Sequence, residues 1–390
     1  MKNICLSGIL QEIQFITMIA AQGQSRRVKF VDKTNSQFFT VLKDRVDEYF
    51  ESNHKSHHAN FQMVLKTVSL LSLYIVPFIL IIWLQPSFPV QMILWLLMGA
   101  GLSGVGMSIM HDANHGAYSE NKTINKILGH TLNLAGGSVQ NWKLQHNILH
   151  HTYTNVAHLD EDINDKLVLR FNPHTKVKAV QKLQFVYAFF FYGITTIYWA
   201  LLKDFIQHKR YVRSGLNSSG KNENNLLLFK MVVDKLIYFA VLFGLPLMAG
   251  ISFLYVLAGF LVMHFAAGII LTVVFQLAHT VEGTSHPLPD ESGNIDNAWA
   301  IHQLHTTVNF SHGNPFLTWY LGGLNYQIEH HLFPRICHIH YPAIAPIVKR
   351  TAKEFGIPYL ENKTFREAFN SHVATLKRFG KLPSLTDAIS

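Results

Sequence analysis

The sequence predicts an all-α integral membrane protein with four transmembrane helices in two hairpins and a cytoplasmic helical cap. Only 15% of the 390 residues are charged, whereas a typical soluble protein has about 25%. The apolar residues are gathered into long runs, and the short connections between paired runs contain no lysine or arginine. The low fraction of charged residues and the long apolar runs indicate a membrane protein. The lack of lysine and arginine in the short connections indicates how the chain is oriented in the membrane.

Four apolar runs are long enough to cross a bilayer, because a transmembrane helix needs about 20 mostly apolar residues. The turn "QPSFP" joins the first run to the second, and "AGIS" joins the third to the fourth, so each pair forms a hairpin. The start of the third run is ambiguous, because Lys230, Asp234 and Lys235 lie there. We therefore expect spans at about residues 67–84, 90–110, 226–248 and 253–276.

The basic residues predict which side of the membrane each segment occupies. Nine lysines and arginines precede the first span, thirteen lie between residues 111 and 225, and nine follow the fourth span. By the positive-inside rule, both termini and the large middle segment are cytoplasmic. The predicted units are an N-terminal cytoplasmic segment with an amphipathic helix near the membrane surface (1–62), a membrane domain (63–350) and a cytoplasmic C-terminal tail (351–390).

Histidine is the unusual component, with 23 residues in three clusters and several single positions. The clusters are "HDANH", "HNILHH" and "QIEHH", and a further histidine follows the fourth span in "FQLAHTVE". Histidines at positions i and i+4 share one face of a helix. A single such pair is often a coincidence, but three clusters on one predicted face of the membrane indicate a metal site. The candidate ligands are His111, His115, His146, His150, His151, His279, His330 and His331.

The number and type of these side chains limit the metal. Neutral imidazole binds iron, zinc or copper. Eight histidines are too many for one ion, so the count favours two metals that keep open positions for oxygen.

The ordered clusters resemble the three histidine boxes of the membrane fatty acid desaturases. "HTYTN" after the second box and "LNYQIEHHLFP" around the third strengthen the resemblance, which covers roughly residues 30–350. It implies a dioxygen-dependent acyl desaturase with two Fe ions in a histidine-ligated di-iron centre. The second box departs from many relatives, because three residues rather than two separate His146 from His150.

Gln327, at the start of the third box, resembles the front-end branch of that family, the delta-5/delta-6 or linoleoyl-CoA type. Other desaturases have histidine there, so Gln327 is expected to bind metal weakly or to hydrogen-bond a metal-bound water. Asp112 and Glu329 are further candidates for metal binding or for support of the ligands. Front-end relatives often carry a fused cytochrome b5 domain marked by "HPGG", which does not occur in this sequence.

The resemblance also implies partners. The substrate would be a long-chain acyl-CoA or acyl lipid, with O2 as oxidant. The sequence has no haem motif and no glycine-rich dinucleotide fingerprint, and its two cysteines, Cys5 and Cys337, are too few for an iron–sulfur cluster with four thiolates. A separate electron donor is therefore expected, either ferredoxin or cytochrome b5 with its reductase. The net charge is +9, but the sequence contains no basic stripe with interleaved aromatic residues. Binding to nucleic acid is therefore not expected.

Four alternatives remain at this stage. A fatty acyl or sphingolipid hydroxylase on the same scaffold would share the boxes. A membrane zinc metalloprotease would want glutamate after its first histidine, where this sequence has Asp112. A metal transporter would place its ligands inside the spans. A soluble carboxylate-type di-iron protein needs two Glu-x-x-His pairs, and we find one such spacing, Glu51 to His54.

A fifth apolar run, residues 183–202, is expected to lie at the membrane interface. It contains eight aromatic residues, which are typical of the interface. Two boxes precede this run and one follows it. Because all boxes must meet at one centre, the number of crossings between them must be even, and the third and fourth spans already supply two.

Overall fold

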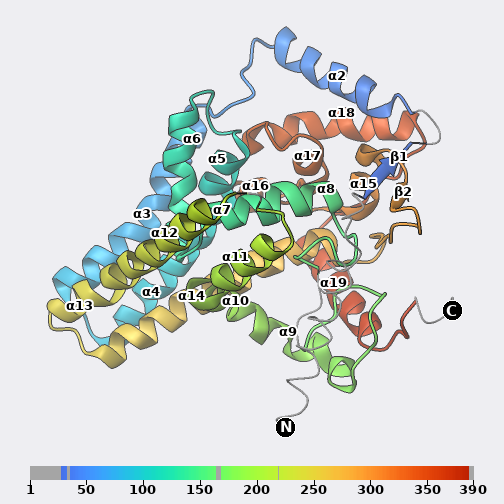
Figure 1. Cartoon of the computed structure of the whole chain (residues 1–390). Helices are drawn as coiled ribbons and strands as arrows, with labels where there is room; N and C mark the ends of the chain where they lie inside the picture. Colours follow the sequence, from blue (N-terminus) through green and yellow to red (C-terminus); the bar gives the residue numbers. More distant parts are fainter. Residues whose placement is uncertain (1–27, 33–35, 164–167, 218, 386–390) are drawn as a thin grey trace.

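A computed structural model describes residues 28–32, 36–163, 168–217 and 219–385 of this chain. Residues 1–27 of the predicted segment 1–62, including Cys5, therefore lie outside the described residues. The described chain is mostly helical, with four short strands in two parallel two-stranded sheets, and long helices extend from a cap of shorter ones (Figure 1). This agrees with the predicted all-α membrane protein.

Three helices in the described ranges are long and apolar enough to cross a membrane. The Asn60 side chain caps the first of them by accepting a hydrogen bond from the Met63 N–H. Gln85 then adopts a left-handed conformation (φ 44°) that ends this helix and starts the turn to the next. The three are α3 (Phe61–Leu84); the continuous helix of α4 (Phe88–Gly104), a π-helical segment (Val105–Met110) and α5 (His111–His115); and α14 (Phe253–His279).

Close packing joins α4 to α14 through glycine. A Cβ atom at Gly259 would lie 2.0 Å from Nε1 of Trp95, and one at Gly99 would lie 2.6 Å from the Met263 carbonyl oxygen. Small residues let helix backbones approach in this way inside a bilayer, where apolar surface alone gives little drive for association. The contact aligns the ends of the two helices that carry His111 and His279.

The third predicted span is helical but differs from the other three. It contains a π-helical segment, and its first half contains Lys230, Asp234 and Lys235. It is not among the three helices that are long and apolar enough to cross a membrane. Its far end still lies beside the turn of the first hairpin, because Nε2 of Gln85 donates to the Ala249 carbonyl oxygen at 2.6 Å. The run consists of α12 (Lys221–Phe239), the π-helical segment (Ala240–Gly244) and α13 (Leu245–Met248).

A buried ion pair explains how a lysine is accommodated in this run. Nζ of Lys235 lies 2.9 Å from the Asp204 carboxylate and donates to the carbonyl oxygens of Gly136, Trp199 and Ala200. A buried charge is tolerated when it is paired and its hydrogen bonds are satisfied. Lys235 therefore attaches the third run to the segment that follows the aromatic run.

The aromatic run forms a bent pair of helices. Residues Ala179–Gly193 and Thr195–Arg213 meet at 51°, and the pair would be a fourth span only if it crossed the membrane as one unit. Both flanks contact the cap. Nε2 of Gln184 donates to the Leu376 carbonyl oxygen, and Arg210 pairs with Glu161 at 3.0 Å. The pair contains 3₁₀ turns (Ala179–Leu183), α9 (Gln184–Gly193), α10 (Thr195–Tyr198), a π-helical segment (Trp199–Lys203) and α11 (Asp204–Arg213).

The N-terminal amphipathic helix was expected near the membrane surface, but its apolar face is covered by protein. In α2 (Phe38–Ser52), Phe38, Leu42, Val46 and Phe50 pack in one core with Val348 and other residues of α18 (Tyr341–Glu354). Figure 1 shows the two helices side by side above the rest of the cap. This apolar face is therefore not available to lipid.

The remaining cap elements surround the ends of α5 and α14, and the C-terminal segment is part of this packing. Arg170, fully buried, donates to the carbonyl oxygens of Phe379 and Leu382. The elements are α6 (Lys122–Gly129), 3₁₀ turns (His130–Ala135), α7 (Val139–Trp142), a π-helical segment (Lys143–His150), α8 (His151–Tyr153), α15 (Trp299–Thr306), α16 (Pro315–Tyr320), α17 (Gln327–Leu332), a 3₁₀ turn (His338–His340) and α19 (Phe365–Phe379), with strands β1 (Lys29–Val31) paired to β2 (Asn294–Asp296) and β3 (Asn309–Phe310) paired to β4 (Glu361–Asn362).

Candidate metal centre

The first histidine pair lies at the end of one of the three long apolar helices. A π-helical segment leads directly into α5, so His111 and His115 project from one face, with ring centroids 4.7 Å apart. Gly116 ends the helix in a left-handed conformation (φ 77°). The pair is thus held at the boundary between the long helices and the cap.

The second cluster lies on a π-helical segment, which explains its unusual spacing. Such a segment widens the helix by one residue per turn and is frequent at functional sites. His146 directs Nε2 to within 3.1 Å of Nε2 of His111. The His150 ring instead lies 4.7 Å from that of His279 and 4.9 Å from that of His331. The three intervening residues therefore direct His146 and His150 toward adjacent groups, and the two also converge with Asp162 in a further set.

The third cluster is placed by the glycine turn that precedes it. Gly322 has φ 64°, and a Cβ there would lie 2.3 Å from the Met107 carbonyl oxygen, so only glycine fits this contact. The turn thus rests against the segment that leads into the first cluster. In α17 the planes of His330 and His331 are 81° apart, which directs the two rings to different groups.

All eight predicted histidines meet in this centre. Candidate ligand nitrogens of one group lie within 4.8 Å of one another, and the same holds for a second group. His151 forms a third set with His330 and His331, so it lies between the other two. The first group is His111, His115, His146 and His330, and the second is His150, His279 and His331.

The centre contains buried nitrogen atoms that have no hydrogen-bond partner. Nε2 of His115, His150, His279, His330 and His331 and both ring nitrogens of His151 are in this state. Buried polar atoms are almost always hydrogen-bonded, so a cluster of exceptions requires an explanation. Nitrogen lone pairs that converge in pairs and triplets fit metal ions.

The opposite ring nitrogens are held by protein groups. Nδ1 of His150 lies 2.9 Å from the Asp160 carboxylate, and Nδ1 of His331 lies 2.9 Å from Oε1 of Gln303. Nδ1 of His330 lies 3.2 Å from the Tyr341 hydroxyl. Metal-binding histidines usually donate their second ring N–H in this way, which fixes the tautomer and the ring direction.

Two of these supporting residues were not found from the sequence. The third, Asp160, lies close to the second box in the sequence, in the acidic stretch "AHLDEDIND". Gln303 and Tyr341 lie in α15 and α18, away from the boxes, and no spacing rule connects them to a histidine. Only the three-dimensional arrangement shows their role.

Burial keeps most of these histidines neutral. It holds the pKa of His146, His151, His330 and His331 well below the ordinary value, and neighbouring histidines lower each pKa further. For His150, burial also disfavours the charged ring, but the Asp160 carboxylate outweighs burial and the pKa is raised. Neutral imidazole is the form that binds metal.

The three further candidates have different surroundings. Gln327 is buried, and its side chain lies near His279 in the second group. Glu329 accepts hydrogen bonds from Asn309 and Tyr359, and burial raises its pKa to about 7. In the described residues neither Glu329 nor Asp112 joins the histidine groups.

Asp112 belongs to a separate buried cluster with Cys337 and His338. Its carboxylate accepts a hydrogen bond from Nδ1 of His338 at 2.8 Å. The other ring nitrogen, Nε2, lies 2.8 Å from Nζ of Lys66. Both ring nitrogens of His338 therefore have protein partners, one a carboxylate and the other a lysine amino group. Asp112 also lies 3.9 Å from Nδ1 of His111.

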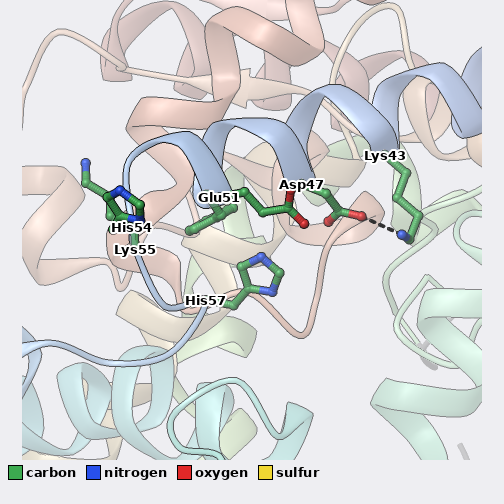
Figure 2. A pocket seen from close by; sticks show the side chains of 7 residues that line it. Lys43, Asp47, Glu51, His54, Lys55 and His57 are labelled. Carbon is green, nitrogen blue, oxygen red and sulfur yellow. Dashed lines mark hydrogen bonds and ion pairs between the residues drawn. The ribbon is translucent and has the colours of Figure 1, made fainter.

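A surface hollow of about 680 Å³ lies at the end of α2, lined by Lys43, Asp47, Phe50, Glu51, His54, Lys55 and His57. Figure 2 shows Lys43 paired with Asp47 along the helix. The hollow contains Glu51 and His54, the one Glu-x-x-His spacing noted above. Within the described ranges these two residues are not part of any group of converging metal ligands. The hollow thus gives no support for a carboxylate-type di-iron site.

Comparisons with known proteins agree with this geometry. The sequence model of the fatty acid desaturase family matches residues 87–363. The chain is 36% identical over 364 residues to the sn-1 linoleoyl-lipid 6-desaturase of Synechocystis sp., covering 92% of this chain and 99% of that protein. It is also 36% identical over 357 residues to the acyl-lipid (8-3)-desaturase of Physcomitrium patens, covering 90% of this chain and 74% of that protein.

Proposed function

This chain belongs to the fatty acid desaturase family, and we propose that it inserts a double bond into a long-chain acyl lipid at a centre of two iron ions. It is an oxidoreductase by family. The observation that supports the metal centre most strongly is the convergence of eight histidines, six of which have a buried ring nitrogen without a hydrogen-bond partner. In His150, His330 and His331 a protein group holds the opposite ring nitrogen. The iron would supply the dioxygen-derived oxidant that an unactivated methylene pair requires.

The residues would divide between the two ions by group. His111, His115, His146 and His330 would hold one ion, and His150, His279 and His331 the other, with His151 between them. Gln327 would support the second ion through its contact with His279. Asp160 holds the His150 ring, and the burial of His150, His279 and His331 would keep water away from the reacting carbons.

The proposed substrate is an unsaturated acyl chain on a membrane lipid, modified between an existing double bond and the carboxyl end. The names of the similar proteins support an acyl-lipid substrate over an acyl-CoA. The same names favour a position close to the carboxyl group, in agreement with glutamine at position 327.

The two other enzyme classes are weaker proposals. A hydroxylase would use the same histidines and would differ only in the product, so product analysis separates the two. A zinc protease needs about three protein ligands, and the second histidine group would then have no purpose.

Metal and product analysis tests the proposal. The protein, purified in detergent, should contain two irons per chain. In liposomes with a linoleoyl lipid, NADH, a reductase and ferredoxin or cytochrome b5 should give one new double bond, and NADH alone should give none. One zinc per chain would contradict the di-iron centre, a hydroxylated product would favour the alternative, and turnover without a carrier would contradict the separate electron donor.

We also propose that four spans cross the membrane, with both termini and the centre on the cytoplasmic side. The bent helix pair then stays on the cytoplasmic side, because its two flanks contact the cap near Leu376 and Glu161. Single cysteines at Val180→Cys and Lys209→Cys should react with an impermeant reagent from the same side. The control is a cysteine in the turn at Ser87, which should react from the opposite side. Labelling of positions 180 and 209 from opposite sides would contradict this arrangement.

A further inference from the structure

We propose that Gln303 is a positioning residue that sets the tautomer and ring direction of His331, an inference that rests on the proposed metal centre. Gln303 lies in α15 and its side chain is fully buried. It contacts the last histidine of the second box through the backbone and the last histidine of the third box through the ring. No sequence motif connects these three positions.

The amide can take only one orientation. Nε2 of Gln303 lies 3.3 Å from the His151 carbonyl oxygen, which also accepts a hydrogen bond from Nε1 of Trp299 at 3.0 Å. A carbonyl oxygen accepts and cannot donate, so the NH2 group must face His151. The other end of the amide, Oε1, then faces Nδ1 of His331 at 2.9 Å.

This orientation fixes the proton on the ring. Oε1 only accepts hydrogen bonds, so Nδ1 of His331 must carry the hydrogen. Nε2 of the same ring is then left with a free lone pair, and this atom is buried without a partner beside His150 and His279. Gln303 therefore selects the tautomer that can bind metal. Oγ1 of Thr154 lies 2.8 Å from the same Oε1 and helps to hold it.

In the second group, the side chains that hold Nδ1 of His150 and Nδ1 of His331 differ in charge. His150 donates to a carboxylate, Asp160, whereas His331 donates to a neutral amide. A second buried carboxylate would add desolvation cost at a site that is already fully enclosed. Gln303 gives direction to the ring without that cost, so its effect is expected on metal binding rather than on the charge of the centre.

The test compares iron binding in three variants of the purified full-length protein. Gln303→Leu removes both hydrogen bonds, whereas Gln303→Glu keeps an acceptor for His331. The matched control is Gln184→Leu, because Gln184 is also fully buried and hydrogen-bonds the Arg170 backbone but contacts no metal-centre histidine. Iron affinity is measured by competition with a chelator, the two iron environments by Mössbauer spectroscopy, and folding by thermal unfolding.

We expect Gln303→Leu to weaken iron binding about 10- to 100-fold, the usual effect of losing such a partner, and to change one of the two iron environments. Gln303→Glu should retain more iron, and Gln184→Leu should lower the unfolding temperature with both irons unchanged. Wild-type iron affinity and spectra in Gln303→Leu, or an equal loss in Gln184→Leu, would overturn the inference. A wild-type protein without iron would instead contradict the proposed centre before any variant is compared.

Discussion

Replacing His330 with alanine is expected to abolish desaturation while the protein stays in the membrane. His330 belongs to the first histidine group and also to the set with His151 and His331, so it lies where the two groups meet. Its Nδ1 is near the Tyr341 hydroxyl, and its Nε2 has no protein partner. Alanine removes this nitrogen and also leaves a cavity, and both effects act at the centre. The measurement is product formation in reconstituted membranes, together with iron per chain.

Two further variants make this result specific. His264 is a fully buried histidine whose ring contacts Tyr238 rather than the centre, so His264→Ala should keep both irons. Gln327→Ala should reduce activity less than His330→Ala, because Gln327 contacts the second group only through His279. An equal loss in Gln327→Ala would make Gln327 a ligand. Full activity in His330→Ala would remove His330 from the centre.

The sequence predicted the composition of the centre better than its geometry. The three clusters and His279 supply the eight histidines that the structure brings together, because a metal centre would need ligands from several separated segments; their roles as ligands stay a prediction. The division into two groups was not predictable. It depends on the π-helical segment at Lys143–His150, which a pattern of side chains does not reveal.

The membrane part shows a similar limit. The first, second and fourth runs were recognised correctly as long apolar helices, because uniform apolarity over about 20 residues is a strong signal. The third run was ambiguous because of its charges, and only the structure shows that Lys235 is paired with Asp204. This pair joins segments 31 positions apart in the sequence, so local composition carries no trace of it.

Replacing Asp160 with asparagine is expected to reduce activity and iron affinity about 10- to 100-fold, because it removes the charge that holds a metal-binding ring. The Asp160 carboxylate lies 2.9 Å from Nδ1 of His150 and accepts hydrogen bonds from the backbone N–H groups of Asn155 and Asp162 at 3.0 Å. An amide can still accept from His150, but its NH2 group then meets one of the two backbone donors. The His150 ring therefore loses its negatively charged partner, and the amide that replaces it holds the ring less firmly.

Glu161→Gln is the matched control, since it neutralises the adjacent carboxylate, which in the described residues is not part of any group of converging metal ligands. Glu161 pairs with Arg210 at 3.0 Å and accepts a hydrogen bond from the Tyr211 hydroxyl at 2.9 Å, so this variant should affect the stability of the cap and leave the iron unchanged. Chelator competition and thermal unfolding distinguish the two effects. If Asp160→Asn and Glu161→Gln lose iron equally, the acidic stretch acts through folding alone, and the His150–Asp160 contact has no separate role in holding the second metal.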